Sequence, residues 1–511
     1  MQNAQKRENR KKQDISCASR ININRKESIK RKELCKKGQR MEALGKEYRE
    51  NVEAFRRALR VAENFDVIER RIPVGRDEMT LFFIDGFVKD MVMQRLMQYF
   101  MGLSGLCGEE REPCAYFADA HIPYVEVDRS GDAAFLRMMV LSGAVVMLGS
   151  TFGAEGIVID ARTYPARNTE EPDNDRVMQG AHDGFVETLI FNTALIRRRI
   201  RDTALTMQYV TVGGASKTDV VLCYMADRAD LDYVRELEKR LAAIAPTQIT
   251  LGTESLTETL IRRRWYNPFP KVRTTERPDA AAAELLEGRV LLLCDTSPQV
   301  MVLPTSIFDF MQETDDYYFP PLTGCYLRLV RHLVFWASLV ITPIWYFFVT
   351  HPAYLPEWLL FLLPQEEYAV PILVQLLLAE IAIDGLKLAS MNTPDVLSGS
   401  LGIIGGLILS DFAVEVGWLS AEVILYMAFV AIASFTQQNP ELGYAFKFLR
   451  VLILLSTAAF GIWGLVGGLV LVPVLLLTNE TMSGRRGYLY PLIPWNGRAM
   501  ARLFFRLKKP N

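Results

Sequence analysis

The stretch VLILLSTAAFGIWGLVGGLVLVPVLLL, residues 451–477, is twenty-seven residues long and contains no charged side chain. A helix needs about 20 apolar residues to cross a hydrocarbon core of about 30 Å, so this stretch is long enough to span a membrane. Four further candidates precede it: Leu333–Val349, Tyr368–Ala389, Gly399–Val416 and Leu419–Phe435. Buried helices of a soluble core are the alternative, but five such segments within 145 residues favour a polytopic membrane protein.

The charge of the 511-residue chain is unevenly distributed, although its formal net charge is only −1. Residues 1–40 carry fourteen bases and four acids, a net of +10, whereas residues 333–477 carry ten acids and three bases, a net of −7. Half of the chain is apolar, which excludes a disordered protein. Seven cysteines scattered over the whole length exclude a disulfide-stapled secreted module.

These differences predict five regions. They are a basic, disordered tail (1–40), two α/β subdomains (41–170 and 171–325), a transmembrane domain (326–480) and a basic C-terminal tail (481–511). Residues 1–40 lack the apolar stretch of a signal peptide, so we expect the α/β region to stay in the cytoplasm. An alternative interpretation is that Met41 is the true start of the protein.

A weak internal repeat divides the α/β region. Residues 80–100 (TLFFIDGFVKDMVMQRLMQYF) and 219–241 (DVVLCYMADRADLDYVRELEKRL) both predict a strand, a short turn and a helix. Residues 133–150 and 282–297 both predict a helix followed by a strand. We therefore expect two tandem subdomains of the same kind. A further strand is expected at His121–Asp128.

No catalytic arrangement emerges, and we predict neither an enzyme nor a cofactor nor a metal site. The stretch GGASKT, residues 213–218, resembles a phosphate-binding loop. Such a loop needs a glycine directly before its lysine and a helix after it. Here Ser216 precedes Lys217 and a strand is expected next, so the pattern argues against phosphate binding.

Basic residues indicate the topology, because they stay on the cytoplasmic side of a membrane. Arg328 and Arg331 precede the first candidate span, and Lys447 and Arg450 fit a cytoplasmic loop before the last. Five spans would place the C-terminus outside, although the tail after Thr478 carries seven bases. Either one candidate is re-entrant or the tail is an interfacial helix. We expect five spans, with four or six as alternatives.

Three charged residues within one candidate span are candidates for an ion pathway. Glu380, Asp384 and Lys387 share one helix face, and a charge at the bilayer centre costs about 2.5–3.5 kcal/mol on insertion scales. Such residues indicate a functional site by default. The alternative is that Asp384 and Lys387 neutralise each other and hold helices together. Glu380 has no basic partner in its own span and is the better pore candidate.

Two further polar candidates and a set of glycines complete this prediction. Gln375 lies beside the charged face, and Asp411 begins a second i, i+4 acidic pair with Glu415. Acidic rings in an oligomer favour cations, although a solvated outer surface is the alternative for this pair. Small residues let helices approach closely. The glycines expected in helix packing are Gly402, Gly406, Gly461, Gly464 and Gly468.

Several stretches carry a family resemblance. They are DGFVETLIFNTALIRRRIRD (183–202), TVGGASKTDV (211–220), NPFPKVRTTERPDAAAAELLEGRVLLLCDTSPQVMVLP (267–304), DYYFPPLTGCYLRLVR (316–331), AEIAIDGLKLA (379–389) and PDVLSGSLGIIGGLILSDFAVEVGWLS (394–420). They resemble the A subunits of bacterial spore germinant receptors, the GerA family. The resemblance covers about 62–495, and residues 1–40 have no counterpart in it.

The resemblance implies a multi-pass protein of the inner spore membrane with a cytoplasmic region of two α/β subdomains. It implies a homo-oligomer, expected to be a pentamer, that forms a channel releasing cations such as potassium. The partners expected are membrane lipid and other membrane subunits of a germination complex, and no nucleic acid. A non-conducting scaffold that assembles germination proteins is the alternative.

A run of arginines lies in the first of these motifs. Arg197, Arg198, Arg199 and Arg201 are expected to act in assembly, through ion pairs between subunits. A solvated helix face is the alternative interpretation.

Overall fold

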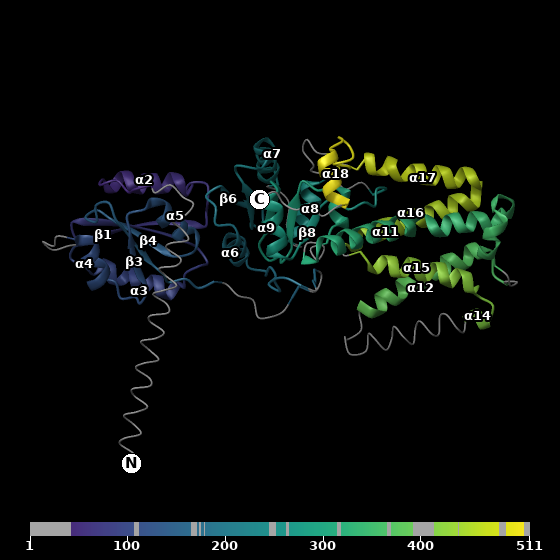
Figure 1. Ribbon diagram of the computed structural model, residues 1–511, viewed down its shortest axis with the longest axis horizontal. Helices are drawn as coiled ribbons and strands as arrows, with labels where there is room; N and C mark the ends of the chain where they lie inside the picture. Colours follow the sequence, from purple (N-terminus) through teal and green to yellow (C-terminus); the bar gives the residue numbers. More distant parts are fainter. Residues whose placement is uncertain are drawn as a thin grey trace, which may run out of the picture. The chain divides into compact units, whose positions relative to one another are not determined.

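Two antiparallel sheets with the same strand order form the α/β part of the computed structural model (Figure 1). The first sheet has the order β1-β2-β4-β5-β3 and the second β6-β7-β9-β10-β8. In each sheet the first two strands form a hairpin, and the other three strands follow in the same order relative to the sequence. The tandem repeat predicted from the sequence is therefore confirmed.

The structure describes most of the chain. The described residues are 42–106, 112–164, 171–172, 175–177, 179–244, 252–261, 265–313, 318–364, 369–391, 413–437, 439–479 and 487–504. The predictions made for the 1–40 tail, Met41, Gly402, Gly406 and Asp411 lie outside them. The chain divides into two compact units, one of residues up to Pro165 with Arg201–Thr203, and one of the remainder.

The first unit surrounds the first sheet with four helices. Its elements are α2 (Tyr48–Ala58), β1 (Val67–Val74), β2 (Asp77–Ile84), α3 (Asp90–Met101), α4 (Pro113–Ala120), β3 (Val127–Ser130), α5 (Ala133–Leu141), β4 (Val145–Gly149) and β5 (Gly156–Ile159). Alternate residues of β2 face opposite sides, as a strand requires. Leu81 packs in the core with α3 and α4, whereas the ring of Phe82 lies 5.5 Å from that of Phe55 in α2.

The strand expected at His121–Asp128 begins later than predicted. Residues 121–126 are irregular, and pairing with β5 starts at Val127. Pro123 lies within this irregular stretch. A proline has no backbone N–H to give to a sheet, so pairing is delayed until after Pro123.

The second sheet and its helices open the second unit. Its elements are α6 (Leu189–Arg199), β6 (Leu205–Val212), β7 (Thr218–Met225), α7 (Leu231–Ala242), α8 (Thr253–Leu260), β8 (Arg273–Thr275), α9 (Pro278–Leu286), β9 (Val290–Cys294), β10 (Val300–Leu303) and η1 (Ile307–Met311). The glycine-rich stretch after β6 is a hairpin turn, in which Gly213 and Lys217 have positive φ. A strand follows it, as the sequence predicted.

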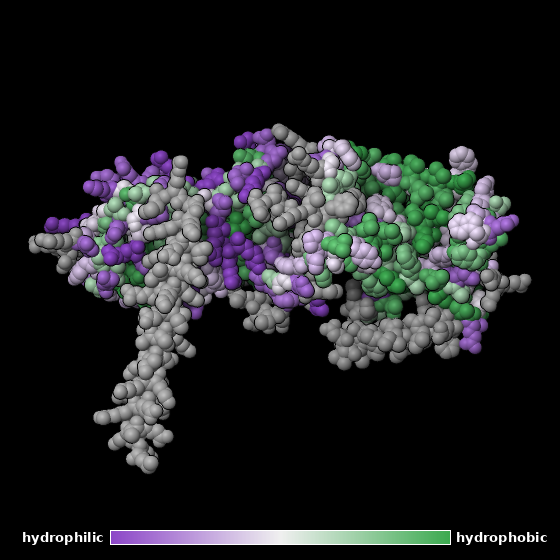
Figure 2. Space-filling model, viewed as in Figure 1, coloured by the Kyte–Doolittle hydropathy of each residue, from purple (hydrophilic) through white to green (hydrophobic). Residues whose placement is uncertain are grey.

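Apolar helices complete the second unit, and Figure 2 shows their hydrophobic exposed surface in green. Their elements are α11 (Pro321–Thr350), η2 (Pro352–Tyr354), η3 (Glu357–Leu362), α12 (Ile372–Met391), α14 (Ala413–Glu415), α15 (Ala421–Phe435), α16 (Pro440–Phe460), α17 (Ile462–Leu477) and α18 (Gly497–Phe504). Among the described residues, α11 and α16 are the two helices long and apolar enough to cross a membrane. Helices α15 and α17 are apolar but shorter.

The prediction that residues 451–477 form one span is wrong. Gly461, with φ of 58°, ends α16 and starts α17, and the two helices form a hairpin. A Cβ on Gly464 would lie 1.8 Å from the carbonyl oxygen of Ser456, and one on Gly468 would lie 3.0 Å from Ile453. Glycine both makes the turn, because it tolerates positive φ, and allows the backbones to approach.

The last turn of α17 returns to the second sheet. The side-chain amide of Asn267 donates to the carbonyl of Leu475 at 2.9 Å. Beyond α17, the Tyr488 hydroxyl donates to the carbonyl of Pro270 at 2.8 Å, and the N–H of Ile307 donates to the carbonyl of Tyr488 at 2.9 Å. The C-terminal segment therefore packs against the α/β subdomain of its own unit.

Candidate functional site in the helical region

Four charged side chains from two apolar helices form the candidate site, which we call the charged cluster. Glu380 and Asp384 belong to α12, and Lys447 and Arg450 to α16. The Arg450 Nε donates to Glu380 Oε1 at 2.6 Å, and the Lys447 Nζ lies 3.7 Å from Glu380 Oε2. Lys447 also contacts the carboxylate of Asp384 and donates to the backbone carbonyl of Glu380 at 3.1 Å. Two acids therefore meet two bases, and the cluster is formally neutral.

The charged cluster lies midway along its helices. Arg450 is the central residue of the 21-residue α16, and Glu380 is close to the middle of the 20-residue α12. At 1.5 Å per residue, α16 is about 30 Å long, the thickness of a hydrocarbon core. The side chains of Glu380 and Arg450 are 7% and 6% exposed. The pair is thus shielded from solvent midway along both helices.

A third helix contributes to the same site. The Arg450 Nη1 donates to the carbonyl of Ser338 in α11 at 3.2 Å. One turn away, the ring centroids of Phe335 and Phe446 are 3.8 Å apart, so aromatic side chains lie next to the charged cluster between α11 and α16. Asp384 is the more accessible acid, since 32% of its side chain is exposed.

Lys387 and Gln375, the two other pathway candidates of α12, make different contacts. Lys387 lies over two aromatic rings, with its Nζ 5.2 Å from the centroid of Phe435 and 5.9 Å from that of Tyr444. Asp384 pairs across helices with Lys447. Gln375 is fully buried at the start of α12, where its Oε1 accepts from the N–H of Ser420 at 2.8 Å.

The sequence missed the two bases of this cluster. Lys447 and Arg450 were assigned to a cytoplasmic loop, and both lie inside α16. In the sequence, charged residues in the first half of an apolar helix resemble the charged residues of a loop that precedes a membrane span. The signal that could have revealed them is the unbalanced pair Glu380 and Asp384, because two acids buried in one apolar helix require bases on another.

The arginine run is used mainly within the chain. Arg197 is fully buried and its Nη1 donates to the carbonyl of Leu205 at 3.2 Å, so a role for it between subunits is wrong. Arg199 pairs with Asp183 at 2.6 Å. Arg198 and Arg201 are exposed, and they keep the predicted role in assembly as a proposal.

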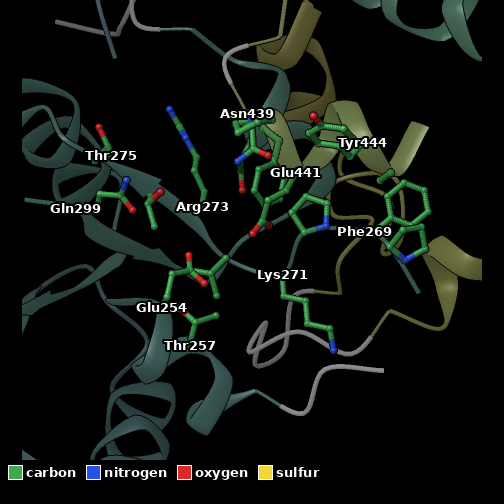
Figure 3. Close-up of a pocket in the computed structure, with 18 of the residues that line it drawn as sticks. Glu254, Thr257, Phe269, Lys271, Arg273, Thr275, Gln299, Asn439, Glu441 and Tyr444 are labelled. Carbon is green, nitrogen blue, oxygen red and sulfur yellow. The ribbon is translucent and has the colours of Figure 1, made fainter. Parts of the chain in front are cut away.

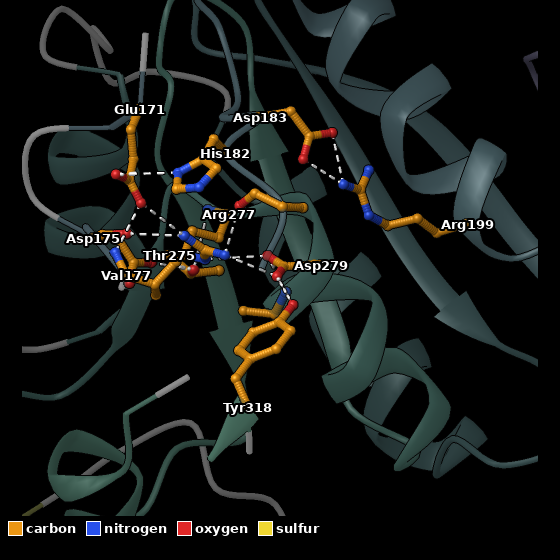
Figure 4. A network of polar contacts seen from close by, with 12 residues as sticks. Glu171, Asp175, Val177, His182, Asp183, Arg199, Thr275, Arg277, Asp279 and Tyr318 are labelled. Atoms are coloured by element: carbon orange, nitrogen blue, oxygen red, sulfur yellow. Dashed lines mark hydrogen bonds and ion pairs between the residues drawn. The ribbon is translucent and has the colours of Figure 1, made fainter. Parts of the chain in front are cut away.

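A second buried arginine organises the segment that enters the second unit (Figure 4). Arg277 is fully buried, and its Nη2 donates to Asp279 at 2.9 Å and to the carbonyl of Ala181 at 2.8 Å. Its Nη1 lies 3.4 Å from Glu171. The Tyr318 hydroxyl, three residues before α11, donates to Asp279 at 2.7 Å. We call this group the Arg277 network.

Two carboxyl groups near Arg277 respond differently to burial. Burial raises the pKa of Asp175, even though the Thr275 hydroxyl donates to its carboxylate at 2.7 Å. Burial acts in the same direction on Asp279, but the hydrogen bonds from Arg277 and Tyr318 outweigh it and leave the pKa below its usual range. Asp279 is therefore held as the anion that the buried guanidinium needs.

A model of the family described as Bacillus/Clostridium GerA spore germination protein matches residues 54–511. The chain belongs to the GerA family. The resemblance predicted from the sequence motifs is therefore confirmed, and with it the membership in a family of spore germination and sporulation proteins.

Individual relatives agree with the family. Stage V sporulation protein AF of Bacillus subtilis (strain 168) is 36% identical over 462 residues, which cover 90% of this chain and 92% of the relative. Residues 82–90 (FFIDGFVKD) and the C-terminal 488–510 had indicated this branch of the family. Spore germination protein KA of the same organism is 26% identical over 456 residues, covering 88% and 82% of the two chains.

Part of the chain is also similar to a solved structure. The N-terminal domain of the A subunit of the Bacillus megaterium spore germinant receptor GerK3 is 21% identical, with a TM-score of 0.40. The match covers 52% of this chain and 97% of that one.

The GerA chain has a cleft of ≈ 730 Å³ where its second sheet meets α16 (Figure 3). Trp265 and residues 267–276 line one side, and Asn439, Glu441 and Tyr444 at the start of α16 line the other. Among the described residues no group of three or more His, Cys, Asp or Glu could hold a metal ion. The description of the matching family names spore germination and no catalytic activity.

Proposed function

We propose that this GerA-family protein is a membrane subunit of a spore germination complex and that its oligomer conducts cations. Its relatives are named for sporulation and spore germination, which supports the process. The observation that carries conduction is the charged cluster, two carboxylates held at the middle of apolar helices by Lys447 and Arg450.

The direction of each helix supports an even number of membrane crossings. Helices α16 and α17 form a hairpin, which divides the last predicted span in two. Gln375 joins the starts of α12 and α15, so these two helices run in the same direction. With six crossings, the seven bases after Thr478 would lie on the side of the second sheet, as the positive-inside rule requires.

The charged cluster suits a gate better than an open filter. In the paired arrangement, bases on α16 neutralise Glu380 and Asp384, so these carboxylates exert little net attraction on a cation. A shift of α16 against α12 would release two carboxylates, the groups that line cation-selective pores. The oligomer, expected to be a pentamer, would repeat this acidic pair around the pathway.

Potassium efflux from liposomes tests this proposal. The Glu380→Gln/Asp384→Asn variant should lose the efflux, because the carboxylates that attract cations are gone. Glu357→Gln is the matched control, since Glu357 is an exposed acid in η3 outside the charged cluster. Lys447→Gln should raise efflux, because Asp384 then loses its partner.

The scaffold remains the second candidate, and one observation favours it. Each of the four charges in the cluster has an oppositely charged partner within the chain, as expected of side chains that only hold helices together. Absence of efflux from wild-type protein that is folded and oligomeric, alone and with its partner subunits, would support the scaffold. Efflux retained by the double variant would keep conduction but reject the charged cluster as its pathway.

A further inference from the structure

Five of the seven tryptophans of this chain are strongly exposed, although an indole ring usually buries most of its surface. The exposed fractions are 97% for Trp265, 74% for Trp358, 63% for Trp418, 80% for Trp463 and 70% for Trp495. Trp345, in contrast, is 3% exposed in the interior of α11. So many exposed indoles need a common explanation.

Three of these tryptophans lie at the end of the helices far from the second sheet. Trp358 belongs to η3, which follows α11. The carbonyl of Leu362, at the end of η3, accepts a hydrogen bond from the Trp345 indole at 2.8 Å. Trp418 lies two residues before Ser420 at the start of α15. The N–H of Ser420 donates to Gln375 at the start of α12. Trp463 opens α17, beside the turn between α16 and α17.

The other two lie at the opposite end, where the helices meet the second sheet. Trp265 is two residues from Asn267, which is bonded to the last turn of α17. Its ring makes an edge contact with that of Tyr266, at 6.0 Å between centroids. Trp495 belongs to the C-terminal segment that Tyr488 fastens to Pro270.

Membrane proteins concentrate Trp and Tyr at the two interfaces between hydrocarbon and headgroups. The surface that leads to Trp265 is apolar, since Val470, Val474 and Leu477 are exposed along α17 and its last turn is bonded to Asn267. We propose that Trp265 and Tyr266, together with Trp495, insert into the phospholipid headgroup layer and form a lipid anchor for the second α/β subdomain. The anchor rests on the membrane placement in the proposed function and is independent of conduction.

The anchor gives the second subdomain a fixed contact with the bilayer. Trp265 and Tyr266 precede β8 by fewer than ten residues, and that strand carries the cleft next to α16. An amphipathic ring suits this place, because its apolar body enters the acyl boundary while its N–H stays among headgroups. The occupant we assign is therefore phospholipid and not a protein partner.

Tryptophan emission of the full-length protein in nanodiscs of phosphatidylcholine and phosphatidylglycerol tests the anchor. The difference spectrum between wild type and Trp265→Phe reports the emission of Trp265 alone. Quenching by lipid brominated near the headgroup should remove most of this difference, and iodide in the water should remove little. Because Trp265 is almost fully exposed, the substitution removes no core packing.

Trp463→Phe and Trp345→Phe are the matched controls. Trp463, at the far end, should be quenched by the brominated lipid if the helices are embedded, whereas the buried Trp345 should respond to neither quencher. Quenching of Trp265 by iodide and not by lipid, with Trp463 quenched by lipid, would overturn the anchor and leave membrane insertion intact. Failure of both Trp265 and Trp463 to respond to lipid would overturn the membrane placement as well.

Discussion

At the scale of single residues, Arg450 holds three helices together. It pairs with Glu380 of α12 and donates to the carbonyl of Ser338 of α11, from its own position in α16. Helical spacing within one segment predicted Glu380 and Asp384 as special residues. It could not predict their partners, because Glu380 and Arg450 are seventy residues apart in sequence and meet only through packing.

A double-mutant cycle measures this pair. Glu380→Gln or Arg450→Gln alone should destabilise the detergent-solubilised protein by about 3–5 kcal/mol, because each leaves a buried charge without its partner. The double variant should be less destabilised than the sum of the two, which thermal or denaturant unfolding can show. Strict additivity would mean that the two side chains do not interact in the folded protein.

Asp309 provides a pH-dependent contribution outside the membrane. Its carboxylate accepts from both Nη atoms of Arg289, at 2.7 and 2.8 Å, and from the N–H of Ser306. Burial acts to raise its pKa, but Arg289 outweighs burial and the pKa lies below its usual range. An acid with a lowered pKa stabilises the fold above its unfolded-state pKa, about 4, and loses this contribution as the pH falls through the folded value.

We therefore expect the stability of wild type to fall below about pH 4 more steeply than that of Asp309→Asn. At pH 7 the variant should be the less stable of the two, because Arg289 then keeps Glu284 but loses the carboxylate that accepts from both of its Nη atoms. Unfolding midpoints measured between pH 7 and pH 3 test this expectation. Parallel curves for the two proteins would show that Asp309 is not the titrating group.

At the scale of elements, the hairpin of α16 and α17 shows where sequence patterns are ambiguous. Glycines at positions 461, 464 and 468 in an apolar run predicted close helix packing. The same pattern arises when one of those glycines breaks the helix and the other two pack the halves against each other. The strands and helices of the repeat were easier to predict, because periods of two and 3.6 residues are local properties.

Gly464 and Gly467 form a matched pair for testing the hairpin. A Cβ on Gly464 would meet the carbonyl oxygen of Ser456 at 1.8 Å, whereas one on Gly467 would meet nothing within 4 Å. Gly464→Ala should destabilise the protein by at least about 1–3 kcal/mol, and Gly467→Ala should be neutral or slightly stabilising. Thermal unfolding in detergent distinguishes them. Equal melting temperatures would contradict the close approach of α16 and α17.

At the scale of the whole molecule, the C-terminal segment and the second sheet share one end of the helices. Sequence rules predicted a conflict, since five spans and a basic tail disagree. Dividing the last predicted span at Gly461 leads to the six crossings proposed above, which would return the tail to the side of the α/β region. Counting charges revealed that five spans disagree with a basic C-terminal tail. The position of the turn at Gly461 could not be predicted from those counts.

Reporter fusions in bacterial cells test this topology. A fluorescent protein fused after residue 511 should fluoresce, because such proteins mature in the cytoplasm, and alkaline phosphatase fused there should be inactive. Phosphatase fused within η3 should be active, since η3 follows the first crossing. Active phosphatase at residue 511 would require an odd number of crossings.

The Arg277 network has a consequence for communication along the chain. One buried guanidinium binds Glu171 and the carbonyl of Ala181 in the segment arriving from the first unit, and through Asp279 it also holds Tyr318. Hydrogen bonds to charged groups contribute about 1.5–3 kcal/mol each. The arriving segment thus cannot be displaced without either moving the residues that lead into α11 or breaking several of these bonds. A mechanical signal in that segment would reach the first apolar helix through Arg277 and through Tyr318, whose ring lies directly against Gly180.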